Sequence, residues 1–179
     1  MFKATLLAAT CAATQLFEDD DAFDSLSVID PGNLTTVEYN TVIAGIMFGI
    51  IDQNDCTEIE ACGTDSAHDV IQAYNALQLI ITRKPLKVAA GVAMLRSVVE
   101  DIPTDLNECK NIQDDIASLQ AWSTVFLDPA HPQKVVEHDV KRHILSLTTH
   151  ARKAQQDWNN ENYFGFGTEL GEMLVIATQ

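Results

Sequence analysis

The residues best suited to bind a metal ion lie in the second half of the chain. Asp139 and His143 are four positions apart and His150 follows seven positions later, so all three would share one side of a helix. One carboxylate and two imidazoles form a ligand set that divalent metals accept. A polar stripe on a long helix accounts for the same spacing more simply, and the His-Glu-x-x-His pattern of zinc proteases is absent. The trio is therefore a candidate site only, and no cofactor is predicted.

Other catalytic patterns are also missing from the sequence. There is no G-x-S-x-G nucleophile motif, no Walker loop and no dinucleotide-binding fingerprint. Carboxylates are abundant, but their positions fit exposed helix faces, so abundance alone identifies no pair of the glycosidase type. We therefore expect a non-enzymatic protein that acts by binding or by extracellular assembly. A metal-dependent hydrolase using Asp139, His143 and His150 is the least favoured alternative.

The N-terminus has the features of an export signal. Lys3 supplies a short positive start, and residues 4–13 are small and apolar without a charge. The run is too short to span a bilayer, and no integral membrane span is predicted elsewhere. We expect a signal peptide over residues 1–13, an acidic leader over 14–35 and a helical bundle domain over 36–179. This organisation predicts a protein that is secreted or held in a vesicle lumen.

Export bears on the cysteines, because extracellular compartments favour disulfides. Removal of the signal would leave Cys56, Cys62 and Cys109. We favour a bond between Cys62 and Cys109, since each lies near a boundary at the same end of the central hairpin, and Cys56 with Cys109 is the alternative. The remaining thiol would be buried, free or bonded to another chain. Asn33 begins an Asn-Leu-Thr sequon, which is a glycosylation site in a suitable secretory pathway.

The overall charge limits the classes of partner. The chain carries 26 acidic and 11 basic side chains, which gives a formal net charge of -15. No nucleic-acid partner is predicted, because binding phosphates needs concentrated positive charge. An anionic membrane surface is disfavoured for the same reason. The acidity fits solubility, cation binding or a basic protein partner, and it does not decide among them.

Amphipathic helices must position all of these residues. The clearest is a hairpin over residues 70–102, in which two apolar stripes with 4-3-4 spacing flank a hinge at 83–85. The stripes are Val70, Tyr74, Leu77 and Ile81, followed by Val88, Val92, Leu95, Val99 and Ile102. Helices are expected over residues 36–52, 66–82, 85–101, 104–126, 133–158 and 160–177, with a polar link over 53–65. The sequence predicts an all-α, single-domain bundle of five or six antiparallel helices, stapled by one disulfide.

Glycines mark places where helices can approach closely. Gly45 and Gly49 are four residues apart in the first of these helices, on one face of it. Gly165, Gly167 and Gly171 remove side chains from the last helix. The apolar segment around Gly45 is too short for a membrane-spanning dimer, so we interpret both groups as packing surfaces within the bundle.

A small apolar cavity is the alternative to a filled core. The residues that would line it are Tyr74, Leu77, Val92, Trp122 and Phe164. Such a cavity would make the protein a carrier of a small apolar ligand or lipid, held between the central hairpin and the last helix. Dense packing is the norm in protein interiors, so we favour a filled core.

From Cys62 onward, the order of features resembles a set of small, exported, all-helical proteins of ciliates and other protists. The shared features are a cysteine before a helix, an apolar hairpin that ends in a D-x-x-E-C-like segment at 105–109, and a helix with a tryptophan. A long polar helix ending in Asp157-Trp158 and an aromatic-glycine stretch at 163–167 complete the pattern. The resemblance implies export, helices and the Cys62–Cys109 pairing. That set has no assigned activity, so the resemblance implies no mechanism.

Overall fold

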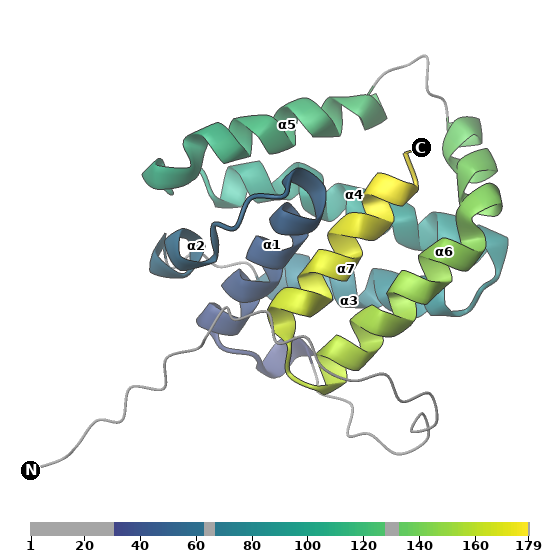
Figure 1. Cartoon of the computed structure of the whole chain (residues 1–179), viewed down its shortest axis with the longest axis horizontal. Coiled ribbons are helices and arrows are strands. Elements are labelled where there is room, and N and C mark those ends of the chain that lie inside the picture. Colours follow the sequence, from purple (N-terminus) through teal and green to yellow (C-terminus); the bar gives the residue numbers. More distant parts are fainter. Residues whose placement is uncertain (1–30, 63–66, 128–132, 179) are drawn as a thin grey trace, which may run out of the picture.

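The computed structural model describes residues 31–62, 67–127 and 133–178, and its regular structure in those ranges is entirely helical (Figure 1). The seven α-helices are α1 (Thr36–Ile51), α2 (Cys56–Cys62), α3 (Ala67–Ile81), α4 (Pro85–Asp105), α5 (Gln113–Leu127), α6 (Gln133–Asn159) and α7 (Tyr163–Ile176). Two short 3-10 helices, η1 (Pro31–Asn33) and η2 (Lys110–Ile112), precede α1 and α5. The predicted all-α bundle is confirmed. The predicted signal peptide and most of the acidic leader lie outside the described residues.

The central hairpin is formed by α3 and α4, as the apolar stripes predicted. Leu77 and Leu95 are at most 1% exposed, and every other member of the two stripes is buried except the half-buried Ile81. Arg83 turns the chain with a φ of 57°, in the left-handed region, and Pro85 occupies the start of α4. Two amphipathic helices joined by a short hinge therefore bury their apolar faces against each other and the rest of the core.

Three boundaries differ from the sequence prediction, and one of them is the start of α5, which lies at Gln113 and not at residue 104. The expected polar link over residues 53–65 contains α2, because Cys56 and Ile59 are three residues apart and both bury their side chains against the core. The expected end of the hairpin helix at Asp101 is wrong, since α4 continues through Pro103. Pro103 lacks only its own amide hydrogen, and the next turn closes when the Leu106 amide donates to the Ile102 carbonyl at 2.9 Å.

The most extensive helix–helix interface among the described elements joins α1 and α7, which lie side by side (Figure 1). Glycines of the two helices face each other in pairs. A Cβ atom on Gly45 would lie 3.0 Å from the Gly167 Cα, and a Cβ on Gly49 would lie 3.0 Å from the Gly171 Cα. Each such atom would also collide with a carbonyl oxygen of the opposite helix. The two backbones are therefore in direct contact, as the glycine spacing predicted.

Aromatic side chains fix the corner between α6 and α7. Trp158 is completely buried, and its ring centroid lies 4.7 Å from Phe166, 4.8 Å from Tyr74 and 5.6 Å from Tyr163. Aromatic pairs at these separations add about 0.5–1.5 kcal/mol each beyond their burial. The cluster joins α3, α6 and α7, so it holds α6 at a defined position against the hairpin.

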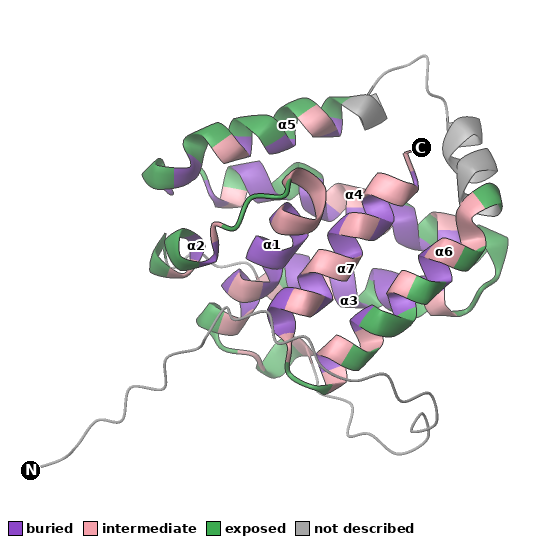
Figure 2. Ribbon diagram, viewed as in Figure 1, coloured by how far each residue is buried: buried purple, intermediate pink, exposed green. Residues whose placement is uncertain are grey.

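Buried residues form one continuous core at the faces where helices meet, and exposed residues lie on the outer faces (Figure 2). None of the helices in the described part of the chain has the length and apolar content that a bilayer span requires.

Candidate functional site

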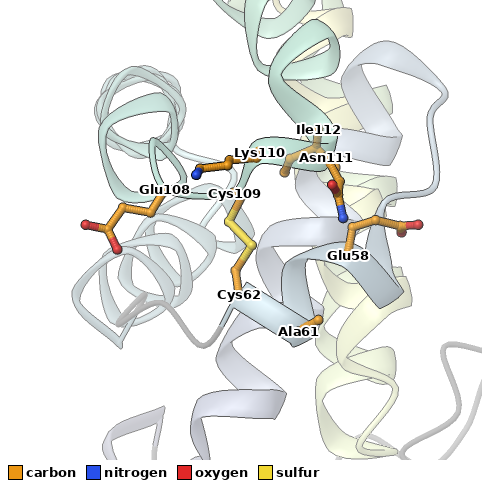
Figure 3. A pocket seen from close by; sticks show the side chains of 8 residues that line it. All are labelled: Glu58, Ala61, Cys62, Glu108, Cys109, Lys110, Asn111 and Ile112. Carbon is orange, nitrogen blue, oxygen red and sulfur yellow. A yellow bond between two sulfur atoms is a disulfide. The ribbon is translucent and has the colours of Figure 1, made fainter.

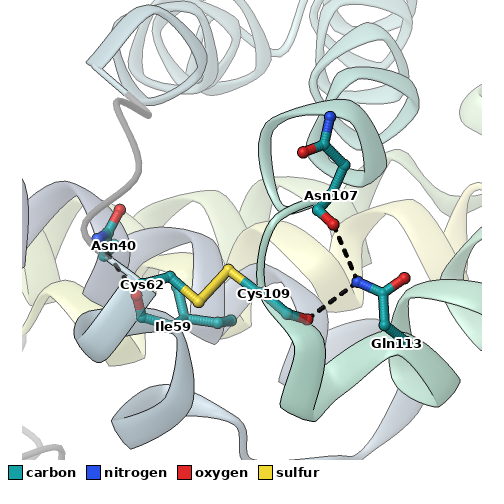
Figure 4. The surroundings of a disulfide bond; sticks show 6 residues. All are labelled: Asn40, Ile59, Cys62, Asn107, Cys109 and Gln113. Carbon is teal, nitrogen blue, oxygen red and sulfur yellow. Dashed lines mark hydrogen bonds between the residues drawn. A yellow bond between two sulfur atoms is a disulfide. The ribbon is translucent and has the colours of Figure 1, made fainter.

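A disulfide joins Cys62, the last residue of α2, to Cys109, which directly precedes η2. The two Cα atoms are 5.6 Å apart, a normal separation for a disulfide. The side-chain amide of Gln113 donates to the Asn107 carbonyl at 3.3 Å and to the Cys109 carbonyl at 2.9 Å (Figure 4). The bond is the pairing favoured from the sequence, and it ties α2 to the connection between α4 and α5.

Helix α1 holds the other side of α2. The buried Asn40 amide donates to the Ile59 carbonyl at 3.4 Å, and the Thr41 hydroxyl donates to a Glu60 carboxylate oxygen at 3.1 Å (Figure 4 shows the first bond). Cys56, the third cysteine expected in the mature chain, is 1% exposed. Cys56 is also disulfide-bonded, so its sulfur is shielded from solvent and is not a free thiol.

An open pocket of about 270 Å³ lies beside the disulfide. Its lining comes from α2 and from the segment that precedes α5, namely Glu58, Ala61, Cys62, Glu108, Cys109, Lys110, Asn111 and Ile112. The carboxylates of Glu58 and Glu108 lie on opposite sides of the disulfide, and the Lys110 side chain extends toward the Glu108 side (Figure 3). The pocket is thus a surface feature bordered by charged side chains, and a disulfide joins its two walls.

A half-buried carboxyl group lies just before α2. Burial, together with the smaller effect of the negative charges of Asp115 and Glu58, raises the pKa of Asp55 to about 6. One carboxyl oxygen of Asp55 is buried without a hydrogen-bond partner. Burial and the neighbouring carboxylates both disfavour the ionised form of Asp55.

A second carboxyl group in the first turn of α3 is more strongly perturbed. Asp69 is 2% exposed, and its Oδ2 atom has no hydrogen-bond partner. Burial raises the pKa of Asp69 to about 8, with further contributions from a hydrogen bond to Asp105 and from the charges of Asp105 and Asp101. Asp69 is therefore protonated at neutral pH and shares a hydrogen bond with a carboxylate near the end of α4.

Asp55 belongs to an acidic region, which we call the acidic end and define as residues 55–62 and 100–115, and Asp69 contacts that region through Asp105. The first segment carries three acidic side chains and the second carries six, against Lys110 as the single basic side chain of the two segments. The sequence shows that acidic side chains outnumber basic ones, but it does not show that the acidic side chains of these two segments lie close together. That proximity depends on the disulfide and on the packing of α2, which the sequence analysis treated as a link.

A separate polar cluster lies between α6 and α7. His150 Nδ1 is 2.7 Å from Glu169 Oε2 and 3.1 Å from Glu172 Oε2. Lys153 is more distant, with its Nζ 3.7 Å from Glu169 Oε1. One side-chain atom from each of His150, Glu169 and Glu172 lies within 4.8 Å of the other two, so these residues are a candidate ligand set for a metal ion.

This set differs from the trio considered in the sequence analysis. His150 belongs to both, and His143 is half-buried on α6 outside the set that the structure assembles. The side chain of Asp139 lies outside the described residues, so the original trio stays a prediction. Glu169 and Glu172 were missed because they come from another helix, and the register of α6 against α7 has no signal in the sequence.

The five residues considered for an apolar cavity occupy the core. Tyr74, Leu77, Val92 and Phe164 are buried and Trp122 is half-buried, and none of them lines the pocket beside the disulfide. Tyr74 contacts the Trp158 ring, and the Phe164 ring lies 5.5 Å from Phe48. The apolar-ligand site stays a prediction.

The predicted glycosylation site lies at the surface. Asn33 is exposed in η1, and Thr35 of its sequon caps α1, with its hydroxyl accepting from the Glu38 amide at 3.3 Å. Glycosylation of Asn33 stays a prediction.

Comparison with known proteins gives one match. A model of the SctB-like family, described as secreted protein B-like, matches residues 24–178, which include every described helix. No curated protein and no solved structure matches the chain. The match bears on secretion and not on the resemblance to proteins of ciliates and protists, which stays a prediction. The chain belongs to the SctB-like family of secreted proteins.

Proposed function

We propose that this secreted protein is not an enzyme and that it acts by binding a positively charged protein segment at the acidic end. The observation that carries the proposal is the concentration of uncompensated negative charge around the pocket. The acidic end carries nine acidic side chains against one basic side chain, and burial together with the charges of Asp115 and Glu58 raises the pKa of Asp55. A cationic side chain placed there would relieve the same repulsion, so the charge favours a basic partner.

The disulfide supports this proposal because it fixes the shape of the pocket. Cys62 and Cys109 connect the two walls, and Glu58 and Glu108 stand on either side of the bond (Figure 3). A surface held in one arrangement loses less conformational entropy when a partner binds. Complementary charge mainly sets the rate and specificity of association, so we expect binding that weakens steeply as salt increases.

Assembly through an intermolecular disulfide is less well supported than binding. Cys56, the cysteine considered for such a bond, is 1% exposed at the start of α2 and is already disulfide-bonded. A bond from Cys56 to another chain would require α2 to open. Noncovalent binding needs no such change, and the acidic end is accessible as the protein stands, with Glu58 and Glu108 exposed.

A peptide titration tests the proposal. A fluorescently labelled lysine-rich peptide is mixed with the full chain at pH 7, at low salt and at about 0.5 M salt, where screening shortens the range of charge interactions to about 4 Å. A glutamate-rich peptide of the same length is the negative control. We expect the lysine-rich peptide alone to bind at low salt, and its affinity to fall at least tenfold at high salt.

Matched variants separate the acidic end from net charge. The double variant Glu58→Gln/Glu108→Gln is expected to weaken peptide binding at least threefold. The double variant Glu161→Gln/Glu172→Gln removes the same charge near α7 and is expected to change affinity less than twofold. Equal losses in the two double variants would mean nonspecific attraction to an acidic protein. Equal losses, or no binding at low salt, would contradict the proposal.

A further inference from the structure

The cluster between α6 and α7 has more negative charge than its histidine can satisfy. Two carboxylate oxygens converge on one atom, His150 Nδ1, at 2.7 Å from Glu169 and 3.1 Å from Glu172. An imidazole nitrogen carries at most one hydrogen, so it can donate a well-aligned hydrogen bond to only one of them. The second carboxylate is left beside the first, where like charges repel.

The positions of the three side chains match what a metal ion requires. The three ligand atoms lie within 4.8 Å of one another. Ligand atoms in a tetrahedral zinc site are about 3.3 Å apart, which follows from metal–ligand bonds of about 2.0–2.2 Å. The two glutamate oxygens, at 2.7 Å and 3.1 Å from His150 Nδ1, are already close to that spacing. We propose that His150, Glu169 and Glu172 bind a divalent transition-metal ion of the zinc class, with water completing the coordination.

The choice of ion follows from the ligand types. Imidazole nitrogen favours zinc and its neighbours among the transition metals. Calcium takes 6–8 oxygen ligands, more than two glutamates and a histidine provide. The side chains of His150 and Glu169 are 19% and 16% exposed, so an ion would be partly shielded from water and still reachable from it.

The helices that carry the ligands are held in register on both sides of the cluster. Facing glycines press α7 against α1, as described above. The turn between α6 and α7 is fixed by Asn162, whose side chain accepts from the Gly165 amide at 3.2 Å and donates to Asp157 at 2.8 Å. A side chain on Gly165 would occupy the space of Asn162. Little reorganisation of the backbone would therefore accompany binding of an ion.

Lys153 is the basic side chain nearest to the cluster and would compete weakly with an ion. Its Nζ lies 3.7 Å from Glu169 Oε1, and its side chain is 55% exposed. An ammonium group on a long exposed stem can move into water when an ion occupies the site. The proposed site is separate from the acidic end, so the failure of either proposal leaves the other unaffected.

Zinc binding to the full chain tests the inference. Titration calorimetry with zinc chloride at pH 7, and metal analysis after dialysis, are expected to give one tightly bound zinc ion per chain. His150→Gln and Glu172→Gln are each expected to weaken that binding at least tenfold. His143→Gln removes another half-buried histidine of α6 and serves as the matched control, with an expected change of less than twofold. In the same titration, calcium ions are expected to bind at least a hundredfold more weakly than zinc ions.

Three results would overturn the inference. The first is the absence of any bound zinc, which would leave His150 as a hydrogen-bonded side chain and no more. The second is zinc binding that His150→Gln and Glu172→Gln leave intact, and the third is an equal loss in His143→Gln. If His150→Gln fails to fold, which circular dichroism would show, Glu172→Gln decides the question, because the Glu172 side chain is 44% exposed and its loss does not disturb the core.

Discussion

The α1–α7 interface and the acidic end are stabilised in opposite ways. Between α1 and α7 there are no side chains at the closest points, and the backbones touch at Gly45, Gly49, Gly167 and Gly171. At the acidic end, the half-buried Asp55 lies among other carboxylates, and a disulfide ties α2 to the segment before α5. One region is stabilised by close packing, whereas the other contains interactions that oppose folding.

From this difference we infer a structural role for the α1–α7 interface, and we place the proposed binding role at the acidic end. Close packing leaves no space for a ligand, so the α1–α7 interface can serve only as a scaffold. Repelling carboxylates lower stability, and proteins commonly retain such features where they bind or react. The disulfide permits that arrangement because it limits how far the acidic elements can separate.

Removal of the disulfide should have the largest effect on stability. We expect Cys62→Ser/Cys109→Ser to lower the free energy of unfolding by about 4 kcal/mol, because the bond closes a loop with a sequence separation of 47 residues. Urea unfolding followed by circular dichroism measures the change. A loss below about 1 kcal/mol would show that noncovalent contacts alone hold the acidic end.

Adding a methyl group at the contact between α1 and α7 should have the next largest effect on stability. Gly167→Ala places a Cβ 3.0 Å from the Gly45 Cα and against the Val42 carbonyl, so the helices must move apart. We expect a loss of about 3 kcal/mol in urea unfolding, which exceeds the gain of about 1 kcal/mol from the better helix propensity of alanine. Asn75→Ala, at an exposed position of α3, should be nearly neutral. A Gly167→Ala protein as stable as the wild type would refute the close backbone contact.

The two regions also differ in how well the sequence predicted them. The hairpin stripes and the glycines of each helix were found from spacing alone, because the periods of three and four residues define a helix face directly. The pairing of the glycines of α1 with those of α7 is seen only in the structure. The short helix α2 was missed because Cys56 and Ile59 supply only two buried residues, too few for a periodic signal. The extension of α4 beyond Pro103 was missed because the rule that proline ends a helix does not account for burial of its ring.

The candidate sites were less predictable than the fold. Asp69 looked like any acidic residue in the first turn of a helix, and its contact with Asp105 depends on how α3 packs against α4. Glu169 and Glu172 reach His150 across two helices for the same reason. Spacing along one helix carries no information about the residues of its neighbour, so only the packed structure shows these groups.

The buried carboxyl group of Asp69 should make stability depend on pH. The pKa of Asp69 in the folded protein, about 8, lies above its ordinary value of 3.8, so its stabilising contribution is fully present below about pH 4 and is lost as pH rises through about 8. Asp69→Asn imitates the protonated form and removes this titration. We expect the variant to gain on the order of 2 kcal/mol over the wild type at pH 8 and to converge with it near pH 4.

Unfolding curves at several pH values measure this convergence, and Asp52→Asn at an exposed position is the control. A constant difference between Asp69→Asn and the wild type across the pH range would show that Asp69 is ionised in the folded protein.

The cap of α1 should have the smallest effect. Thr35 and Glu38 form a capping box, in which the Thr35 hydroxyl accepts from the Glu38 amide and the Glu38 carboxylate accepts from the Thr35 amide at 2.6 Å. We expect Thr35→Ala to lower stability by about 1 kcal/mol in thermal unfolding. Thr35→Ala and Asn33→Gln both remove the glycosylation sequon, but Asn33→Gln keeps the helix cap. In protein made without glycans, Asn33→Gln should therefore leave the stability unchanged. A Thr35→Ala effect no larger than that of Asn33→Gln would exclude the cap.

The central claim is that a basic partner binds at the acidic end and not at the α1–α7 interface. Mapping the peptide-binding surface by nuclear magnetic resonance tests this claim most directly. Amide chemical shifts of the full chain are recorded at pH 7 and low salt while a lysine-rich peptide is added. We predict changes concentrated in residues 55–62 and 100–115, and none in residues 42–49 and 164–171, where α1 contacts α7. Changes spread evenly over the surface, or concentrated at α1 and α7, would contradict the account.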